Sequence, residues 1–106
     1  MLPAGSMSGA PKLAAIEILG RLEVEPRGAY AGCAGWVAAS GTATLGMTIR
    51  SLLIERDRVT VGAGGGITWG SIGADEVAEV ALKARAPLAA IGATLPPDWA
   101  ERGPVA

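Results

Sequence analysis

The chain has 106 residues, enough for one domain with a modest core, because a chain of this size buries only about two-thirds of its unfolded surface. Half of the residues are apolar, but only 4% are aromatic and Phe and His are missing, so a core must come from Ala, Leu, Ile and Val. The absence of His removes the commonest general base and metal ligand. A net charge of −1 without a basic cluster disfavours binding to nucleic acid or to an anionic membrane.

The sequence predicts a cytoplasmic protein. Residues 1–12 have neither a basic region nor a long apolar run, so they do not read as a signal peptide, and no segment approaches the roughly 18 apolar residues of a membrane span. The single cysteine, Cys33, excludes an internal disulfide and fits a reducing compartment. On an apolar strand we interpret Cys33 as a small core residue rather than a nucleophile.

Residues 3–12, PAGSMSGAPK, predict a loop that runs into a helix, with Ser8 as its N-cap and Pro11 in its first turn. The free amides of this loop could instead hold an anion. The pattern is not a Walker A loop, because Lys12 is neither preceded by Gly nor followed by Ser or Thr. Apolar residues that recur every three to four positions from Lys12 to about Glu23 predict an amphipathic helix.

Alternating apolar residues predict three strands, at about 30–39, 43–55 and 59–69, joined by tight turns into an antiparallel meander. With a helix before and after the meander, the order predicts an α+β fold. In the second predicted strand Arg50 lies on the polar side. Its guanidinium could bind a carboxylate through two hydrogen bonds, or it could be an ordinary surface charge.

The third predicted strand contains a glycine run made of Gly62, Gly64, Gly65 and Gly66. Glycine inside a strand loses side-chain packing and costs entropy, so the run predicts a bulge or a place where another group approaches the backbone closely. A small ligand and a tightly packed neighbouring helix are both consistent with this pattern.

A second long helix is predicted after residues 71–74, and it carries Glu76, Glu79 and Lys83 on one face at i, i+3 and i+7. Two carboxylates one turn apart, with no His or Cys nearby, suit a hard cation such as Mg2+, with water and a substrate oxyanion completing its shell. The alternative is a solvated helix face.

The sequence as a whole is predicted to have a structured part, residues 1–93, and a proline-rich flexible tail, residues 94–106.

Five motifs in fixed order carry a specific resemblance: PAGSMSGAPK, RGAYAGCAGW, MTIRS, GAGGGI and EVAEVALKA. Together they resemble the C-terminal segment of the chorismate-utilising enzymes, the family of anthranilate synthase component I, aminodeoxychorismate synthase component I, and isochorismate and salicylate synthases. The likeness covers Pro3 to about Ile91. It implies that the meander is part of a larger two-sheet chorismate-binding sandwich, so exposed sheet edges are expected.

The resemblance also implies a substrate site and a metal site. Positions that bind substrate in the family match Ser6, Tyr30, Arg50, Gly64, Gly66 and Lys83. Glu76 and Glu79 match acidic residues of the Mg2+ site, and Arg50 matches the arginine that holds a chorismate carboxylate. In the family, Mg2+ orients and neutralises the ring-proximal carboxylate of chorismate while the ring hydroxyl leaves.

Within the family, the wording PAGSMSGAPK, with Ser6 where Thr is frequent, favours the aminodeoxychorismate synthase branch. That branch converts chorismate into 4-amino-4-deoxychorismate for folate synthesis, with ammonia delivered by a glutamine amidotransferase subunit. The alternative is anthranilate synthase component I, which uses similar inputs, eliminates pyruvate and serves tryptophan synthesis.

Several features depart from the family pattern. Its catalytic domain is several times longer, and the upstream part supplies a further Mg2+ glutamate, a His and, in aminodeoxychorismate synthases, a nucleophilic lysine in a PIKGT-type motif, none of which is in this sequence. The turn GSIGADE also lacks the frequent acidic wording DSDPEAE. We therefore expect the chain alone to be catalytically incomplete, and an upstream half-domain or a homo-oligomer to complete it. The alternative is a non-catalytic remnant that folds by oligomerising.

Overall fold

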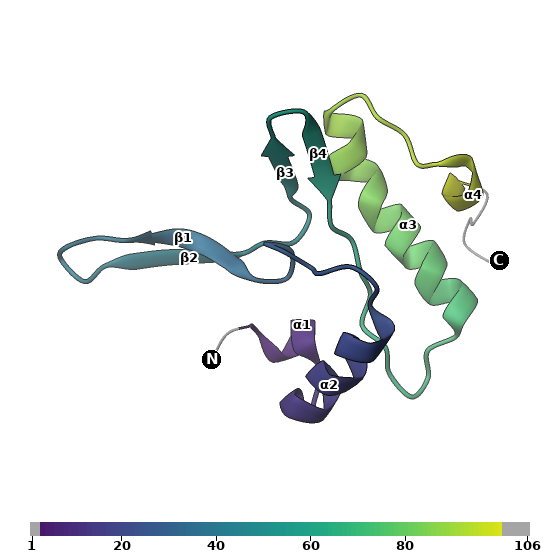
Figure 1. The fold of residues 1–106 in the computed structure, drawn as a ribbon, viewed down its shortest axis with the longest axis horizontal. Helices are drawn as coiled ribbons and strands as arrows, with labels where there is room; N and C mark the ends of the chain where they lie inside the picture. Colours follow the sequence, from purple (N-terminus) through teal and green to yellow (C-terminus); the bar gives the residue numbers. More distant parts are fainter. Residues whose placement is uncertain (1–2, 101–106) are drawn as a thin grey trace. The chain divides into compact units, whose positions relative to one another are not determined.

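The structure is a computed structural model that describes residues 3–100, without the side chain of Ala100. The chain divides into two compact units, Met1–Ile49 and Arg50–Ala106. The elements, labelled in Figure 1, are α1 (Gly5–Ser8), α2 (Lys12–Leu22), β1 (Cys33–Val37), β2 (Ala43–Met47), β3 (Leu52–Glu55), β4 (Arg58–Val61), α3 (Gly73–Ala90) and α4 (Pro97–Ala100). Within residues 3–100, no helix is both long and apolar enough to cross a lipid bilayer.

The predicted first helix is confirmed as α2, but its start differs from the prediction. Its N-cap is Pro11, and no side chain caps it. Ser8 is not the N-cap, because its hydroxyl is engaged elsewhere. It lies buried in α1, donates to the carbonyl of Ala4 at 3.4 Å and accepts a hydrogen bond from Lys12 Nζ at 2.9 Å.

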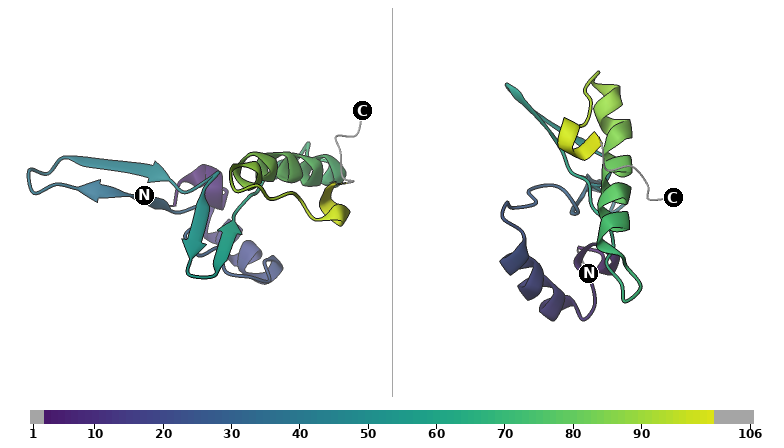
Figure 2. Two further views of the ribbon diagram at one scale, coloured as in Figure 1. Left: turned by 90° about the horizontal axis from the view of Figure 1, so that it is seen from above. Right: turned by 90° about the vertical axis from the view of Figure 1, so that its right-hand side faces the viewer.

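The first hairpin of the chain pairs β1 with β2 in antiparallel register, with Gly35 opposite Leu45. A Cβ on Gly35 would lie 1.9 Å from the carbonyl oxygen of Thr44, so only glycine fits there. The turn between the strands, drawn at the end of the long ribbon in Figure 2, uses a positive φ of 85° at Gly41. Trp36 remains 55% exposed on this hairpin.

The three-stranded meander predicted from the sequence is wrong. Within the described residues, β1 and β2 form one two-stranded sheet, and β3 and β4 form another. The predicted strand at 43–55 is broken at residues 48–51, where Arg50 adopts a left-handed φ of 53° that cannot continue a strand. The apolar alternation runs through this break at Ile49, which is why periodicity did not reveal it. The α+β class itself is confirmed.

The second unit contains the β3–β4 hairpin and α3. A two-residue turn at Arg56 and Asp57 joins the strands, as expected, and Glu55 pairs with Arg58 across it at 3.0 Å. The chain then passes through irregular residues 62–72 into α3, and after α3 it turns back beside the helix into α4 (Figures 1 and 2). The short helix α4 lies in the predicted flexible tail, residues 94–106, and residues 101–106 of that tail lie outside the described residues.

The buried apolar core of residues 3–100 is small and is made mainly of alanines. Its alanines are Ala31 in the first unit and Ala78 and Ala81 in the second, and Pro87 of α3 is buried as well. The apolar stripe of α2 stays largely uncovered, with Leu13 78% exposed and Leu22 71% exposed. An exposed stripe of this kind marks a surface that another protein element can bury.

Candidate functional site

Residues 62–68 follow β4 without regular secondary structure, so the predicted third strand ends at Val61 rather than near residue 69. This segment lies against α3. A Cβ on Gly65 would be 3.0 Å from Glu76 Oε2 and 3.7 Å from Val80 Cγ2, whereas a Cβ on Gly66 would meet nothing within 4 Å. The neighbouring helix therefore explains the glycine at Gly65, whereas Gly66 borders open space and a ligand there stays a prediction.

Glu76 lies in the first turn of α3, and its two carboxylate oxygens have different surroundings. Oε1 accepts a hydrogen bond from Ser71 Oγ at 2.5 Å. Oε2 is buried and has no hydrogen-bond partner among the described residues. A buried carboxylate oxygen without a partner costs free energy, so this atom is the natural place for a cation or a donor to bind.

Glu79 and Lys83 form a pair one turn further along α3. Lys83 Nζ lies 2.5 Å from Glu79 Oε1, and it also donates to the carbonyl of Gly64 at 3.3 Å. The lysine side chain is 26% exposed and that of Glu79 is 49% exposed. Lys83 thus connects α3 to the irregular segment 62–68, and the second unit brings together Gly64, Glu79 and Lys83.

The residues at this face fit Mg2+ as part of a larger ligand shell. Glu76 and Glu79 would supply oxygen ligands: Glu76 Oε2 has no hydrogen-bond partner among the described residues, whereas Glu79 Oε1 is paired with Lys83. Within residues 3–100, no group of three or more His, Cys, Asp or Glu residues is placed to hold a metal ion by itself. Mg2+ commonly binds through one or two carboxylates and keeps several waters, so two glutamates suffice for its protein ligands on this segment.

Arg50 begins the second unit and is exposed. The sequence placed it on the polar side of a strand, and this is wrong, because it lies in the left-handed backbone region between β2 and β3. A residue with a side chain rarely adopts this conformation, and such positions cluster at functional sites.

Ser6 and Tyr30 belong to the first unit. Ser6 is exposed in α1, and charged side chains hold α1 on both sides of it: Lys12 Nζ donates to the carbonyl of Pro3 at 2.6 Å, and Arg27 Nη1 donates to that of Met7 at 2.8 Å. Tyr30 is half-buried in a turn before β1, with its amide donating to the carbonyl of Arg27 at 3.0 Å. It was predicted to begin a strand, but the strand starts only at Cys33.

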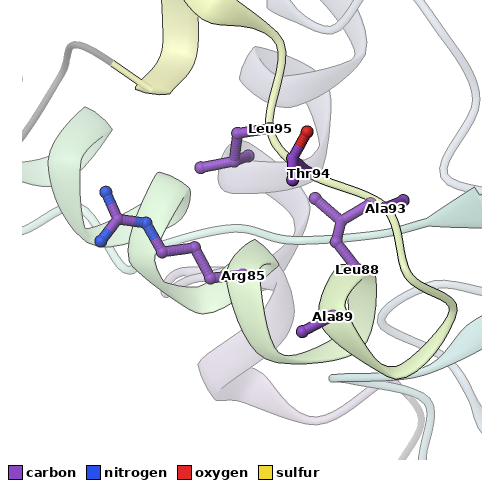
Figure 3. A pocket seen from close by; sticks show the side chains of 6 residues that line it. All are labelled: Arg85, Leu88, Ala89, Ala93, Thr94 and Leu95. Carbon is purple, nitrogen blue, oxygen red and sulfur yellow. The ribbon is translucent and has the colours of Figure 1, made fainter.

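Figure 3 shows a hollow of about 310 Å³ near the C-terminal end of α3. It is lined by Arg85, Leu88, Ala89, Ala93, Thr94 and Leu95. The hollow is lined mainly by apolar side chains and contains none of the residues that the sequence predicted for the site.

Sequence reasoning did not include Gly65 or Ser71 among the site residues, although Gly65 was part of the glycine run. It singled out Gly64 and Gly66, although Gly65 is the glycine that faces Glu76. Ser71 and Glu76 are five positions apart, which does not match the three-residue spacing of a helix-capping box, so no motif pointed to their hydrogen bond.

Comparison with known proteins identifies the family. Residues 1–89 match the family of chorismate binding enzymes, so the chain belongs to that family. It is 44% identical over 89 residues to an aminodeoxychorismate synthase of Streptomyces pristinaespiralis, covering 84% of the chain and 12% of that relative. It is 46% identical to the chloroplastic aminodeoxychorismate synthase of Arabidopsis thaliana, covering 84% of the chain and 10% of the relative.

An anthranilate synthase component 1 of Streptomyces coelicolor is 43% identical over 89 residues, with 84% of the chain and 17% of the relative covered. The chain thus spans between a tenth and a fifth of the length of these relatives. No solved structure gives a significant match. Identity is nearly equal for the two kinds of synthase, so it does not separate them.

Proposed function

We propose that this chain is the C-terminal part of an aminodeoxychorismate synthase component I, which aminates chorismate to 4-amino-4-deoxychorismate. Ammonia would come from a glutamine amidotransferase subunit. The observation that carries the proposal is the buried Glu76 Oε2, which has no hydrogen-bond partner among the described residues and faces the irregular segment 62–68 at Gly65. Family membership and the wording PAGSMSGAPK around Ser6 support the choice of reaction.

In this proposal the second unit supplies a cation site and a carboxylate site. Glu76 and Glu79 hold Mg2+, which would neutralise the ring-proximal carboxylate of chorismate when bound. Arg50 binds a substrate carboxylate through its planar guanidinium, which matches a carboxylate in two-pronged geometry.

Lys83, Gly64 and Gly66 would contact the same ligand. The ammonium of Lys83 is already held by Glu79 and by the carbonyl of Gly64, so little side-chain freedom is lost when an anion arrives. The backbone of Gly66 borders open space and can be approached closely. In the first unit Ser6 and Tyr30 would supply hydroxyl groups to the substrate.

Anthranilate synthesis is the second candidate, because an anthranilate synthase component 1 is nearly as similar to the chain, at 43% identity. The products discriminate the two. In the presence of Mg2+, a full-length synthase that carries this segment should convert chorismate and ammonia into an amino compound that keeps its enolpyruvyl group. Release of pyruvate together with a fluorescent aromatic product would instead identify anthranilate synthesis.

Mg2+ titration of three variants in that full-length synthase tests the metal site. Glu76→Gln and Glu79→Gln should lower the rate of chorismate consumption and raise the Mg2+ concentration needed for half-maximal rate, with part of the loss restored at high Mg2+. Asp75→Asn, on the neighbouring arc of α3, should behave like the wild type. Identical titration curves for all three variants would mean that Glu76 and Glu79 do not bind Mg2+.

A further inference from the structure

Ser71 lies at the end of a tight turn that holds its hydroxyl oxygen in place. The amide of Ser71 donates to the carbonyl of Thr68 at 3.1 Å, and the amide of Thr68 donates to Ser71 Oγ at 2.9 Å. Thr68 Oγ1 also lies 3.5 Å from Ser71 Oγ. Because a backbone donor occupies one lone pair of Ser71 Oγ, the direction of the serine O–H bond is restricted.

The serine proton is directed at Glu76. Ser71 Oγ lies 2.5 Å from Glu76 Oε1, the length of a charge-assisted O–H···O⁻ hydrogen bond. On the other side of the carboxylate, Oε2 faces the backbone at Gly65. The carboxylate is thus fixed at one oxygen by a donor and confined at the other by the backbone.

Helix capping does not explain this serine. The N-cap of α3 is Ile72, and no side chain caps the helix. The amide of Glu76 already donates to the carbonyl of Ile72 at 3.0 Å, so the first helical turn is closed by backbone alone. The Ser71 hydroxyl therefore serves the carboxylate of Glu76 rather than the end of the helix.

We propose that Ser71 is a positioning residue for the cation site: its hydroxyl occupies Glu76 Oε1 and so presents the buried Oε2 as the ligand oxygen. This inference rests on the Mg2+ site of the proposed function. Groups that orient a metal-binding carboxylate typically change metal affinity by about 10- to 100-fold when they are removed. Without the Ser71 hydroxyl, the Glu76 carboxylate can rotate, so neither of its oxygens is held in a fixed position for the cation.

Direct cation binding to a full-length synthase that carries this segment tests this without any turnover assay. Mg2+ binding is measured by calorimetry, and Mn2+ binding by the electron paramagnetic resonance signal of the free ion. Ser71→Ala should weaken binding about tenfold, whereas Ser71→Thr, which keeps the hydroxyl, should stay within about threefold of the wild type. Ser71→Cys replaces the hydroxyl with a somewhat larger thiol that donates only weakly, so it should fall between them.

Two further variants separate this inference from the proposed function. Ser40→Ala removes a hydroxyl that pairs with Thr42 Oγ1 at 3.1 Å in the first unit, and it should bind cations like the wild type. Glu76→Gln removes the ligand itself. Loss of binding in Glu76→Gln with full binding in Ser71→Ala and Ser71→Cys would overturn the role of Ser71 and leave the metal site standing. Equal binding by the wild type and Glu76→Gln, or none by either, would overturn both.

The cysteine and threonine variants protect the test against misfolding. If Ser71→Ala alone loses the circular dichroism signal of the folded protein, the order of affinities among serine, threonine and cysteine at this position still tests the role of the hydroxyl. A purely structural serine would change stability in these variants without changing the affinity of the folded chain for Mn2+.

Discussion

Glu23 and Glu76 are both glutamates near helix ends, but both carboxylate oxygens of Glu23 are paired, whereas only one oxygen of Glu76 is. Glu23 follows α2, and Arg27 binds both of its oxygens: Nη2 lies 2.5 Å from Oε1, and Nε lies 2.8 Å from Oε2. Glu76 lies in the first turn of α3 and has Ser71 on Oε1, while Oε2 is buried without a partner among the described residues. A carboxylate whose oxygens are all paired has little left to offer a ligand, whereas a half-paired one is ready to bind.

The same contrast extends to what each carboxylate stabilises. Through Arg27, Glu23 is linked to the carbonyl of Met7 and thus to the segment that carries Ser6. The hydrogen bond of Glu76 links it to the turn at Ser71, and its unpartnered oxygen is a cost to the folded chain. Costs of this kind are typical of functional sites, where stability is sacrificed for binding.

The largest expected effect distinguishes the two glutamates directly. Glu76→Gln should lower the affinity of the chain for Mg2+ at least tenfold, because Mg2+ loses an anionic ligand whose position is already fixed. Glu23→Gln should leave the affinity unchanged, because both oxygens of Glu23 are taken by Arg27. Calorimetric titration of both variants checks this, and a similar loss in both would mean that the difference in pairing has no bearing on binding.

A smaller effect is expected from the backbone that faces Glu76. In Gly65→Ala the added methyl group would lie 3.0 Å from Glu76 Oε2, so the carboxylate must move by a few tenths of an ångström. We expect Mg2+ affinity to fall several-fold, by less than when the ligand itself is removed. Gly70→Ala in the same segment is the matched control, since a Cβ there meets nothing within 4 Å. Equal affinities for the two alanine variants would show that Glu76 is not confined from this side.

Sequence periodicity predicted the two long helices well and the sheet poorly, and it did not predict the four-residue helices α1 and α4. Both α2 and α3 were anticipated close to their observed bounds, because a 3.6-residue period over three or more turns is a strong signal. The strands are only four or five residues long, and a period of two cannot reveal a single left-handed residue such as Arg50. The meander was therefore predicted where the structure has two hairpins.

The candidate site was foreseen in its residue types but not in its pairing. Spacing on one helix face was enough to group Glu76, Glu79 and Lys83, because that grouping depends on helix geometry alone. Which carboxylate would remain unpaired depends on the path of the irregular segment before α3. Hydrogen bonds across such a segment, as from Ser71 to Glu76, have no characteristic spacing, so the sequence could not predict them.

The smallest expected effect concerns the paired glutamate and its pH dependence. The hydrogen bonds from Arg27 lower the pKa of Glu23, and the same contact with Glu23 raises the pKa of Arg27. A lowered carboxyl pKa means that the pair stabilises the folded unit above the ordinary glutamate pKa of about 4.3, and that this stabilisation is lost as pH falls through the lower folded value. Arg27 stays charged throughout that range, so Glu23 alone sets the pH dependence.

Arg27→Met tests this at the amides of α2. At pH 7 the variant should exchange these amides a few times faster than the wild type, because a partly exposed pair contributes below about 1 kcal/mol. Taking the ratio of the two rates at each pH cancels the intrinsic pH dependence of exchange. The ratio should approach one as the solution is made acidic enough to protonate Glu23 in the folded chain. Glu76→Gln, compared with the wild type in the same way, should not speed exchange in α2 at either pH. A ratio for Arg27→Met that stays constant from neutral to acidic pH would show that Arg27 acts through the carbonyl of Met7 rather than through the carboxylate.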